Sequence, residues 1–192
     1  MQSLAAIAGS VLIVLSAIPY IVSILKGKAH PNLVTWVTWT LLAGVQTAAD
    51  LSAGADRTAL LSAGATLGNG LILLLALSRG VKKYSAFDVM CQALALAGFV
   101  LWRLTGNPNT AVALSSAVIL VAALPTWRHA YLSPYAEIWI NFALGGLAGL
   151  LTILSLTSYT FAGLALPGIT LINAFVMTTV INLRRRQIPL AS

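Results

Sequence analysis

Two asparagines, Asn69 and Asn173, carry the side chains in this sequence that are best suited to bind a polar solute. Each ends a similar run within an apolar stretch, Thr-Leu-Gly-Asn at 66–69 and Thr-Leu-Ile-Asn at 170–173. An amide offers two donors and an acceptor oxygen, and burying it without partners is costly. Each amide could bond to a neighbouring helix. Because the pair recurs, we expect both asparagines to contact one solute in a central site.

Two pairs of aromatic residues could form a wall of such a site. Trp36 and Trp39 are three residues apart, as are Trp139 and Phe142, so each pair lies on one face of a helix. Such rings either belong to the aromatic belt of a membrane interface or stack on a ring-shaped solute, and both interpretations stay open. Trp127 is expected in the belt.

Tyr20, Asn141 and Glu137 are candidates for a gate or a coupling group. Glu137 is expected in the first turn of a helix, where the helix dipole favours negative charge, with Arg128 nearby. The carboxylate is then either a stable acid at the interface or a group that couples proton movement to transport. Val34 occupies the matching place earlier in the chain, so this charge occurs once.

Pro19 and Pro125 each lie inside an apolar stretch that is expected to be helical. Proline removes a backbone hydrogen bond and kinks a helix. The kink could be static and serve packing alone. Because it recurs at matched places, we expect a pair of hinges for a conformational change.

The sequence offers little for catalysis. His30 and His129 are expected in loops, and Cys91 is the only cysteine. We find no paired carboxylates, no cysteine-based metal site and no phosphate-binding loop. We therefore expect a protein that is not an enzyme and that holds no cofactor and no metal.

The composition is that of an integral membrane protein. Of the 192 residues, 59% are hydrophobic and 8% are charged, and the mean hydropathy is +0.92. Soluble domains carry roughly 25% charged residues, so this chain could not cover a surface that faces water. The net charge of +7 does not indicate nucleic acid binding, because the basic residues lie in short loops between apolar stretches.

Seven apolar stretches are long enough to cross a bilayer as helices. No Lys or Arg precedes the first stretch, which is too long for the core of a signal peptide, so we expect it to remain as a span. The fold class expected is therefore all-α integral membrane, with these spans: 3–25, 32–50, 58–78, 87–104, 109–127, 135–157 and 160–183.

Seven spans would separate the basic residues unevenly between two sides. Arg57 and Arg103 lie on one side, and the remaining Lys and Arg lie on the other: Lys26, Lys28, Arg79, Lys82, Lys83, Arg128, Arg184, Arg185 and Arg186. An excess of Lys and Arg marks the cytoplasm. We expect an outer N-terminus and a cytoplasmic C-terminus, in a plasma membrane such as the bacterial inner membrane, with Arg184–Arg186 as an anchor beside anionic lipid.

The matched positions divide the chain into two copies and a linker. The first bundle is expected at 1–79, a linker region with the fourth span at 80–107, and the second bundle with a basic tail at 108–192. Three spans end on the side opposite to their start, and the extra span returns the chain. Both copies then insert the same way up, as 3+1+3 parallel repeats.

This organisation resembles the SWEET and PQ-loop superfamily of small transporters. The resemblance rests on Ala-Ile-Pro-Tyr at 17–20, on Leu-Pro-Thr-Trp at 124–127, on the basic loops that follow, and on Asn69 and Asn173 in the third helix of each copy. It covers nearly the whole chain. The PQ dipeptide is absent, and Trp39 stands where SWEETs have a proline in the second helix.

The resemblance implies transport of a small polar solute, sugar-like or amino-acid-like, by alternating access between two triple-helix bundles. It implies that the asparagine pair faces the solute. The expected partners are this solute and the lipid bilayer, and a homo-oligomer is left open. The alternative on the same architecture is a seven-helix receptor or sensor that binds a ligand without moving it.

Overall fold

The structure is a computed structural model, and it describes residues 2–31, 33–80, 104–135 and 137–188, together with positions 86, 89, 90, 93, 96, 97 and 100. Most of the expected fourth span at 87–104, and most of the linker region at 80–107, lie outside the described residues.

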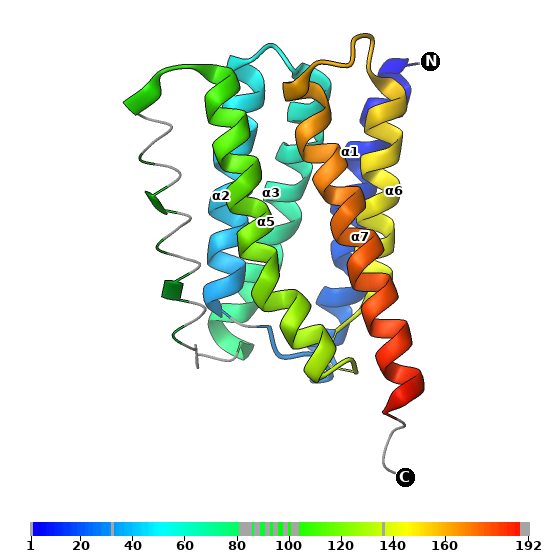
Figure 1. The fold of residues 1–192 in the computed structure, drawn as a ribbon. Helices are drawn as coiled ribbons and strands as arrows, with labels where there is room; N and C mark the ends of the chain where they lie inside the picture. Colours follow the sequence, from blue (N-terminus) through cyan, green and yellow to red (C-terminus); the bar gives the residue numbers. More distant parts are fainter. Residues whose placement is uncertain are drawn as a thin grey trace.

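The described residues form six helices and no strand (Figure 1). Most of their bounds are close to the expected spans, although α5 and α7 continue four or more residues further than expected. The helices are α1 (Gln2–Leu25), α2 (Leu33–Ser52), α3 (Asp56–Arg79), α5 (Pro108–Leu132), α6 (Trp139–Ser155) and α7 (Phe161–Gln187).

Four of these helices are long and apolar enough to cross a membrane, against the seven spans expected from the sequence. They are Ser3–Leu25, Asp56–Arg79, Val112–Leu132 and Phe161–Gln187. α6 is apolar but has 17 residues, and α2, which carries Gln46 and Asp50, is not among the four. The structure is thus that of an all-helical protein with several helices suited to a membrane.

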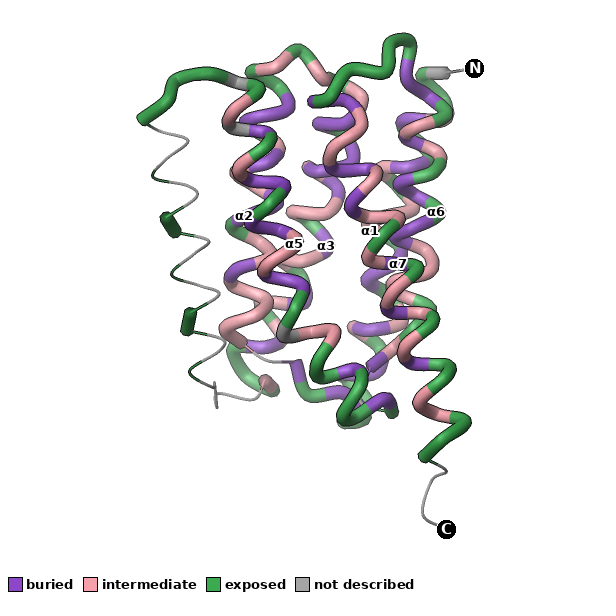
Figure 2. The backbone as a smooth tube through the Cα atoms, viewed as in Figure 1, coloured by how far each residue is buried: buried purple, intermediate pink, exposed green. Residues whose placement is uncertain are grey.

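The outer surface of the bundle is apolar. On α1, large side chains with 46% to 68% exposure recur every three or four residues: Leu4, Ile7, Val11, Leu15 and Ile18. Figure 2 shows such exposed positions on the outward faces of the helices and buried positions toward the interior. A stripe of this length on a soluble protein would be an aggregation hazard, whereas lipid is a suitable solvent for it.

The helices pack in the same pattern within each half of the chain. α3 packs against α1 and α2, and α7 packs against α5 and α6. We call α1–α3 the first trio and α5–α7 the second trio. The two trios meet where α1 packs against α6 and where α2 packs against α5. In Figure 1, α1, α3, α5 and α7 run in one direction, and α2 and α6 run in the other.

The basic residues gather at one end of this bundle, which we call the basic end. It holds the loop after α1, the ends of α3 and α5, and the end of α7, with these residues: Lys26, Lys28, Arg79, Arg128, Arg184, Arg185 and Arg186. Arg57, at the start of α3, lies at the opposite end, which we call the distal end. Lys82, Lys83 and Arg103 are outside the described residues.

Close helix packing depends on glycine at several contacts. A Cβ atom on Gly146 would lie 2.4 Å from the Cβ of Ala174, and one on Gly149 would lie 2.8 Å from the carbonyl oxygen of Pro167. Both pairs join α6 to α7. Without a side chain, the two backbones can approach closely and gain dispersion contacts along their length.

The start of α6 differs from the sequence expectation. The span was expected to begin at residue 135, with Glu137 in its first turn, but α6 begins at Trp139 and Glu137 lies in the preceding loop. The physical reason is on α7. Arg185 donates from Nε to the carbonyl of Pro134 at 3.1 Å and from Nη2 to the carbonyl of Glu137 at 2.8 Å, so an arginine satisfies groups that a helix would otherwise satisfy.

Candidate functional site

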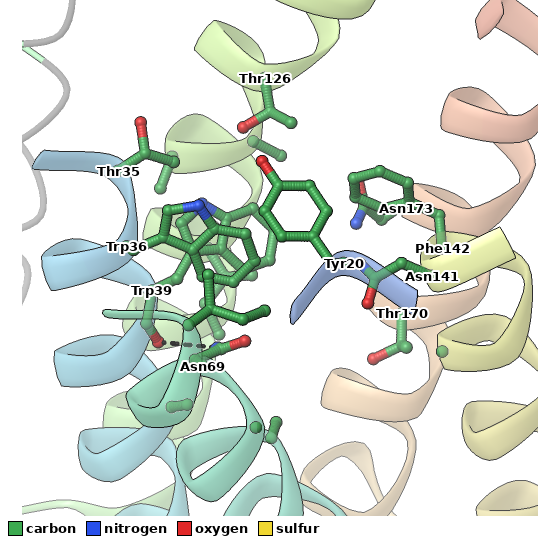
Figure 3. Close-up of a pocket in the computed structure, with 18 of the residues that line it drawn as sticks. Tyr20, Thr35, Trp36, Trp39, Asn69, Thr126, Asn141, Phe142, Thr170 and Asn173 are labelled. Carbon is green, nitrogen blue, oxygen red and sulfur yellow. Dashed lines mark hydrogen bonds between the residues drawn. The ribbon is translucent and has the colours of Figure 1, made fainter. Parts of the chain in front are cut away.

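A cavity of about 580 Å³ lies between the two trios and is lined by all six described helices. Figure 3 shows it in close-up. Eight of the expected site residues line it: Tyr20, Trp36, Trp39, Asn69, Glu137, Asn141, Phe142 and Asn173. Trp139 is not in the lining, and its side chain is 38% exposed on the surface. Eight of the residues that were assigned to one site from the sequence therefore lie around one cavity, and they come from both halves of the chain.

The cavity reaches the surface at the basic end. Among its lining residues, His30, Arg128, His129 and Leu132 are exposed, and all belong to the loops or helix ends there. Toward the distal end, a buried apolar cluster closes the space, with Leu42, Leu61, Val118, Ile119, Leu166 and Ile169 among its members. A solute could enter from the basic end but would meet packed side chains beyond the middle of the bundle.

The two asparagines enter the cavity from different trios, and Figure 3 shows them on opposite sides of it. Nδ2 of Asn69 donates to the carbonyl of Trp39 at 3.3 Å, and Oδ1 of Asn173 accepts from Nε1 of Trp127 at 2.7 Å. Among the described residues, no protein group bonds to Oδ1 of Asn69 or to Nδ2 of Asn173. One side of the cavity thus offers an acceptor and the other offers a donor.

Trp127, which was expected in an aromatic belt, joins α5 to α7. Its side chain is partly buried and its indole N–H is bonded to Asn173. Since that bond uses the amide oxygen, it fixes which end of the amide faces the cavity. No local pattern in the sequence marks this contact, because Asn173 lies 46 residues further along the chain.

Aromatic rings line the cavity on both sides. The rings of Tyr20 and Trp36 have centroids 5.2 Å apart and planes tilted by 49°. In Figure 3, Trp39 lies beside Trp36, and Phe142 lies across Tyr20, near Asn141 and Asn173. The indole nitrogen of Trp39 is buried and, within the described residues, has no hydrogen-bond partner. An unpaired buried donor costs free energy, so a bound acceptor here would be stabilised.

Glu137 is buried at the cavity mouth and pairs with a histidine. One carboxylate oxygen, Oε1, lies 2.9 Å from Nδ1 of His129, and the side chain of Glu137 is 7% exposed. His129 was expected in a loop, but α5 continues to Leu132 and carries it in its last turns. Arg128, the partner expected from the sequence, is exposed and lines the mouth. The role of His129 was not predicted, because the span was expected to end at residue 127 and α5 ends at Leu132.

A second polar cluster lies toward the distal end and was not predicted. It contains Gln46 and Asp50 of α2, Ser62 of α3 and Ser115 of α5, all buried. Nε2 of Gln46 donates to Oδ1 of Asp50 at 2.7 Å, and Oγ of Ser62 donates to Oδ2 at 3.0 Å. Oγ of Ser115 donates to Oε1 of Gln46. The i, i+4 spacing of Gln46 and Asp50 was the signal that the sequence offered.

Among the described residues, three hydrogen bonds between the two trios lie toward the distal end. The first is the bond from Ser115 to Gln46. In the second, Oγ1 of Thr58 donates to the carbonyl of Gly163 at 2.9 Å, and in the third, Arg57 donates to the carbonyl of Ser155. Together with the packed alanines of α2 and α7, they hold this end closed.

The expected hinge prolines occupy matched places beside the cavity. Pro19 lies inside α1 and Pro125 inside α5, and both helices continue beyond them. The residue two positions before each proline lines the cavity, as does the residue that follows it: Ala17, Tyr20, Ala123 and Thr126. α7 also contains a buried proline, Pro167, which was not among the expected hinges.

Over the described part of the chain, no group of three or more His, Cys, Asp or Glu residues could hold a metal ion. The chemistry that the cavity offers is hydrogen bonding, aromatic stacking and one buried carboxylate. In comparisons with known proteins, no family model, no curated protein and no solved structure matches this chain.

Proposed function

We propose that this protein is a membrane transporter of a small polar solute and that it works by alternating access between two triple-helix bundles. The observation that carries the proposal is the cavity itself: it lies between the two trios, opens at the basic end and ends at packed side chains. Its volume of about 580 Å³ is within the range of small-molecule sites, about 300–1,000 Å³.

The proposed architecture is that of the SWEET and PQ-loop superfamily, with seven helices in 3+1+3 parallel repeats and the fourth helix within 80–107. The repeated packing pattern supports it: exchanging α1 with α5, α2 with α6 and α3 with α7 reproduces the main helix contacts. Membrane transporters built from parallel repeats hold the substrate where the repeats meet. The asparagine pair lies at such an interface.

The proposed orientation follows from charge. If the basic end faces the cytoplasm, the N-terminus is outside and the described conformation is open to the cytoplasm. Opening of the distal end would then need the three bonds between the trios to break and the trios to rock about the cavity. Pro19 and Pro125 lie where such bending would move cavity-lining residues.

The proposed solute is neutral and polar, sugar-like or amino-acid-like. Oδ1 of Asn69 would accept a hydroxyl or amine proton, and Nδ2 of Asn173 would donate to an oxygen. The rings of Tyr20, Trp36 and Phe142 offer apolar faces on which a ring-shaped solute would stack. The buried carboxylate of Glu137 is engaged by His129, whose Nδ1 lies 2.9 Å from Oε1.

Uptake into proteoliposomes tests the proposal. A panel of labelled sugars and amino acids should identify a transported solute, and Asn69→Ala and Asn173→Ala should each reduce its uptake about five- to thirtyfold, since loss of a hydrogen bond costs about 1–2 kcal/mol. Asn182→Ala is the matched control, because Asn182 is an exposed asparagine of α7 outside the cavity. Undiminished uptake in both cavity variants would contradict the assignment of the site.

Ligand binding measured in parallel separates transport from sensing. A solute that stabilises the purified protein against heat but never crosses the bilayer would assign the cavity to a receptor instead. Transport predicts that the same solute both stabilises the protein and accumulates in the vesicles.

A further inference from the structure

The Asp50 carboxylate is a buried acid without a cation beside it. Its residue has no exposed surface, and its oxygens accept from Gln46 at 2.7 Å and from Ser62 at 3.0 Å. Both donors are uncharged, and among the described residues Asp50 has no ion-pair partner. A buried carboxylate without a counter-charge is costly, so this environment favours the neutral, protonated acid.

The charged and titratable groups at the distal end do not offset this cost. On α3, Asp56 is exposed and Arg57 donates to the carbonyl of Ser155. The described parts of α5 and α7 that face α2 here contribute Val112, Ser115 and Ala162, none of which carries a charge. In the loop between α6 and α7, Tyr159 is 68% exposed.

The Ser62 hydroxyl allows the site to hold either protonation state. Besides Oδ2 of Asp50, Oγ of Ser62 lies 3.1 Å from the carbonyl oxygen of Ala59 and 3.3 Å from that of Thr58. When Asp50 is ionised, the hydroxyl donates to the carboxylate. When Asp50 is protonated, the acid donates to Oγ and the hydroxyl proton turns to a backbone carbonyl. Neither state requires heavy atoms to move.

Gln46 links this acid to the contact between the trios. Its amide nitrogen donates to Asp50, and its amide oxygen accepts from Ser115 of α5. Separation of α2 from α5 would break the bond to Ser115 and admit water beside Asp50. Hydration lowers the cost of a charge, so the open distal end would favour the ionised carboxylate.

We infer that Asp50 is a proton-binding site that couples protonation to closure of the distal end. The inference rests on the proposed alternating access and adds a coupling proton to it. One proton from solvent binds the carboxylate as the end closes, and the same proton leaves as the end opens. No other covalent bond forms or breaks. Acid therefore favours the closed distal end, and alkaline solution favours the open one.

Cysteine accessibility tests the inference without any transported solute. In a Cys91→Ser background, Val112→Cys places a thiol at a fully buried position of α5 beside α2 and α7. Its labelling by a polar maleimide in detergent is divided by that of Asn109→Cys, an exposed position on the same helix, so that the pH dependence of thiol reactivity cancels. The ratio should rise with pH, by up to about tenfold per pH unit for one linked proton.

The Asp50→Asn variant, which keeps the shape of the acid and stays neutral, should give a low ratio at every pH. Asp56→Asn, an exposed acid at the same end, should behave as the unchanged protein. Infrared difference spectra distinguish the loss of the proton site from a folding defect in this variant. The carbonyl stretch of a protonated acid should be present in the unchanged protein and missing from Asp50→Asn.

A ratio that does not change with pH, or that changes equally in Asp50→Asn, would overturn the inference. So would a response to Na⁺ at constant pH in place of a response to protons. Failure of the proposed function has a different signature, since a missing solute flux leaves the labelling result intact. Flux without pH-dependent labelling would keep the transporter and remove the proton site.

Discussion

The indole N–H of Trp127 donates to Oδ1 of Asn173 at 2.7 Å, from α5 to α7. This bond lies within the second trio and has no equivalent in the first, where Asn69 donates to a backbone carbonyl instead. The two asparagines occupy matched places in the sequence and yet present opposite ends of their amides to the cavity. A solute bound between them would have a defined orientation.

Trp127→Phe should weaken solute binding without abolishing transport. The ring is retained, but Asn173 loses the donor that orients it and its amide can rotate. We expect about a five- to tenfold rise in KM, from the loss of a hydrogen bond of about 1 kcal/mol, with a smaller change in kcat. Uptake kinetics in proteoliposomes measure both. Trp139→Phe, outside the cavity, should leave KM unchanged.

The pairing of Glu137 with His129 should appear as a coupling free energy. Alanine replacement of each residue, singly and together, forms a double-mutant cycle on thermal unfolding in detergent. Because the side chains lie 2.9 Å apart and one is buried, we expect a coupling of about 0.5–3 kcal/mol. Additive effects would show that the contact contributes nothing, and a cycle of Glu137 with His30 supplies the comparison.

Gly149→Ala should destabilise the protein, whereas Gly168→Ala should not. A Cβ on Gly149 would lie 2.8 Å from a backbone oxygen of α7, and one on Gly168 would meet nothing within 4 Å. Overpacking of this kind costs about 1–3 kcal/mol. Melting temperatures in the same detergent compare the two variants. Equal melting temperatures would mean that the α6–α7 contact can relax.

Arg185→Ala should loosen the loop before α6. Its guanidinium holds two loop carbonyls and lies 5.1 Å from the centre of the Tyr135 ring. Hydrogen exchange of peptides that cover residues 133–138 should become faster, while α6 itself stays protected. Arg185→Lys should rescue only in part, because an ammonium cannot reproduce the planar fork. Arg186→Ala is the charge-matched control.

The sequence predicted the fold best where local patterns decide it. The first three spans were found to within a few residues, because long apolar runs end at Gly27, Gly54 and Gly80. The start of α6 could not be found in this way, since it depends on Arg185, which lies about fifty residues further along the chain. Long-range side-chain bonds leave no local signature.

The candidate site was also predictable only where a local pattern in the sequence marks it. The recurring asparagines were visible as a pattern and both line the cavity. The Asp50 cluster was visible only in part: Gln46 and Asp50 are one helical turn apart, but Ser115 joins them from another helix. A polar residue in an apolar span indicates that a second polar group is buried beside it. Which residue supplies that group depends on how the helices pack.

The 17 residues of α6 have a consequence for the surrounding lipid. At 1.5 Å per residue the helix is about 25 Å long, whereas the hydrocarbon core of a bilayer is about 30 Å thick. α6 packs against α1, whose 24 residues exceed that thickness. A bilayer around this pair must therefore be thinner beside α6 than beside α1. A change in acyl chain length would then strain the contact between α1 and α6, which joins the two trios.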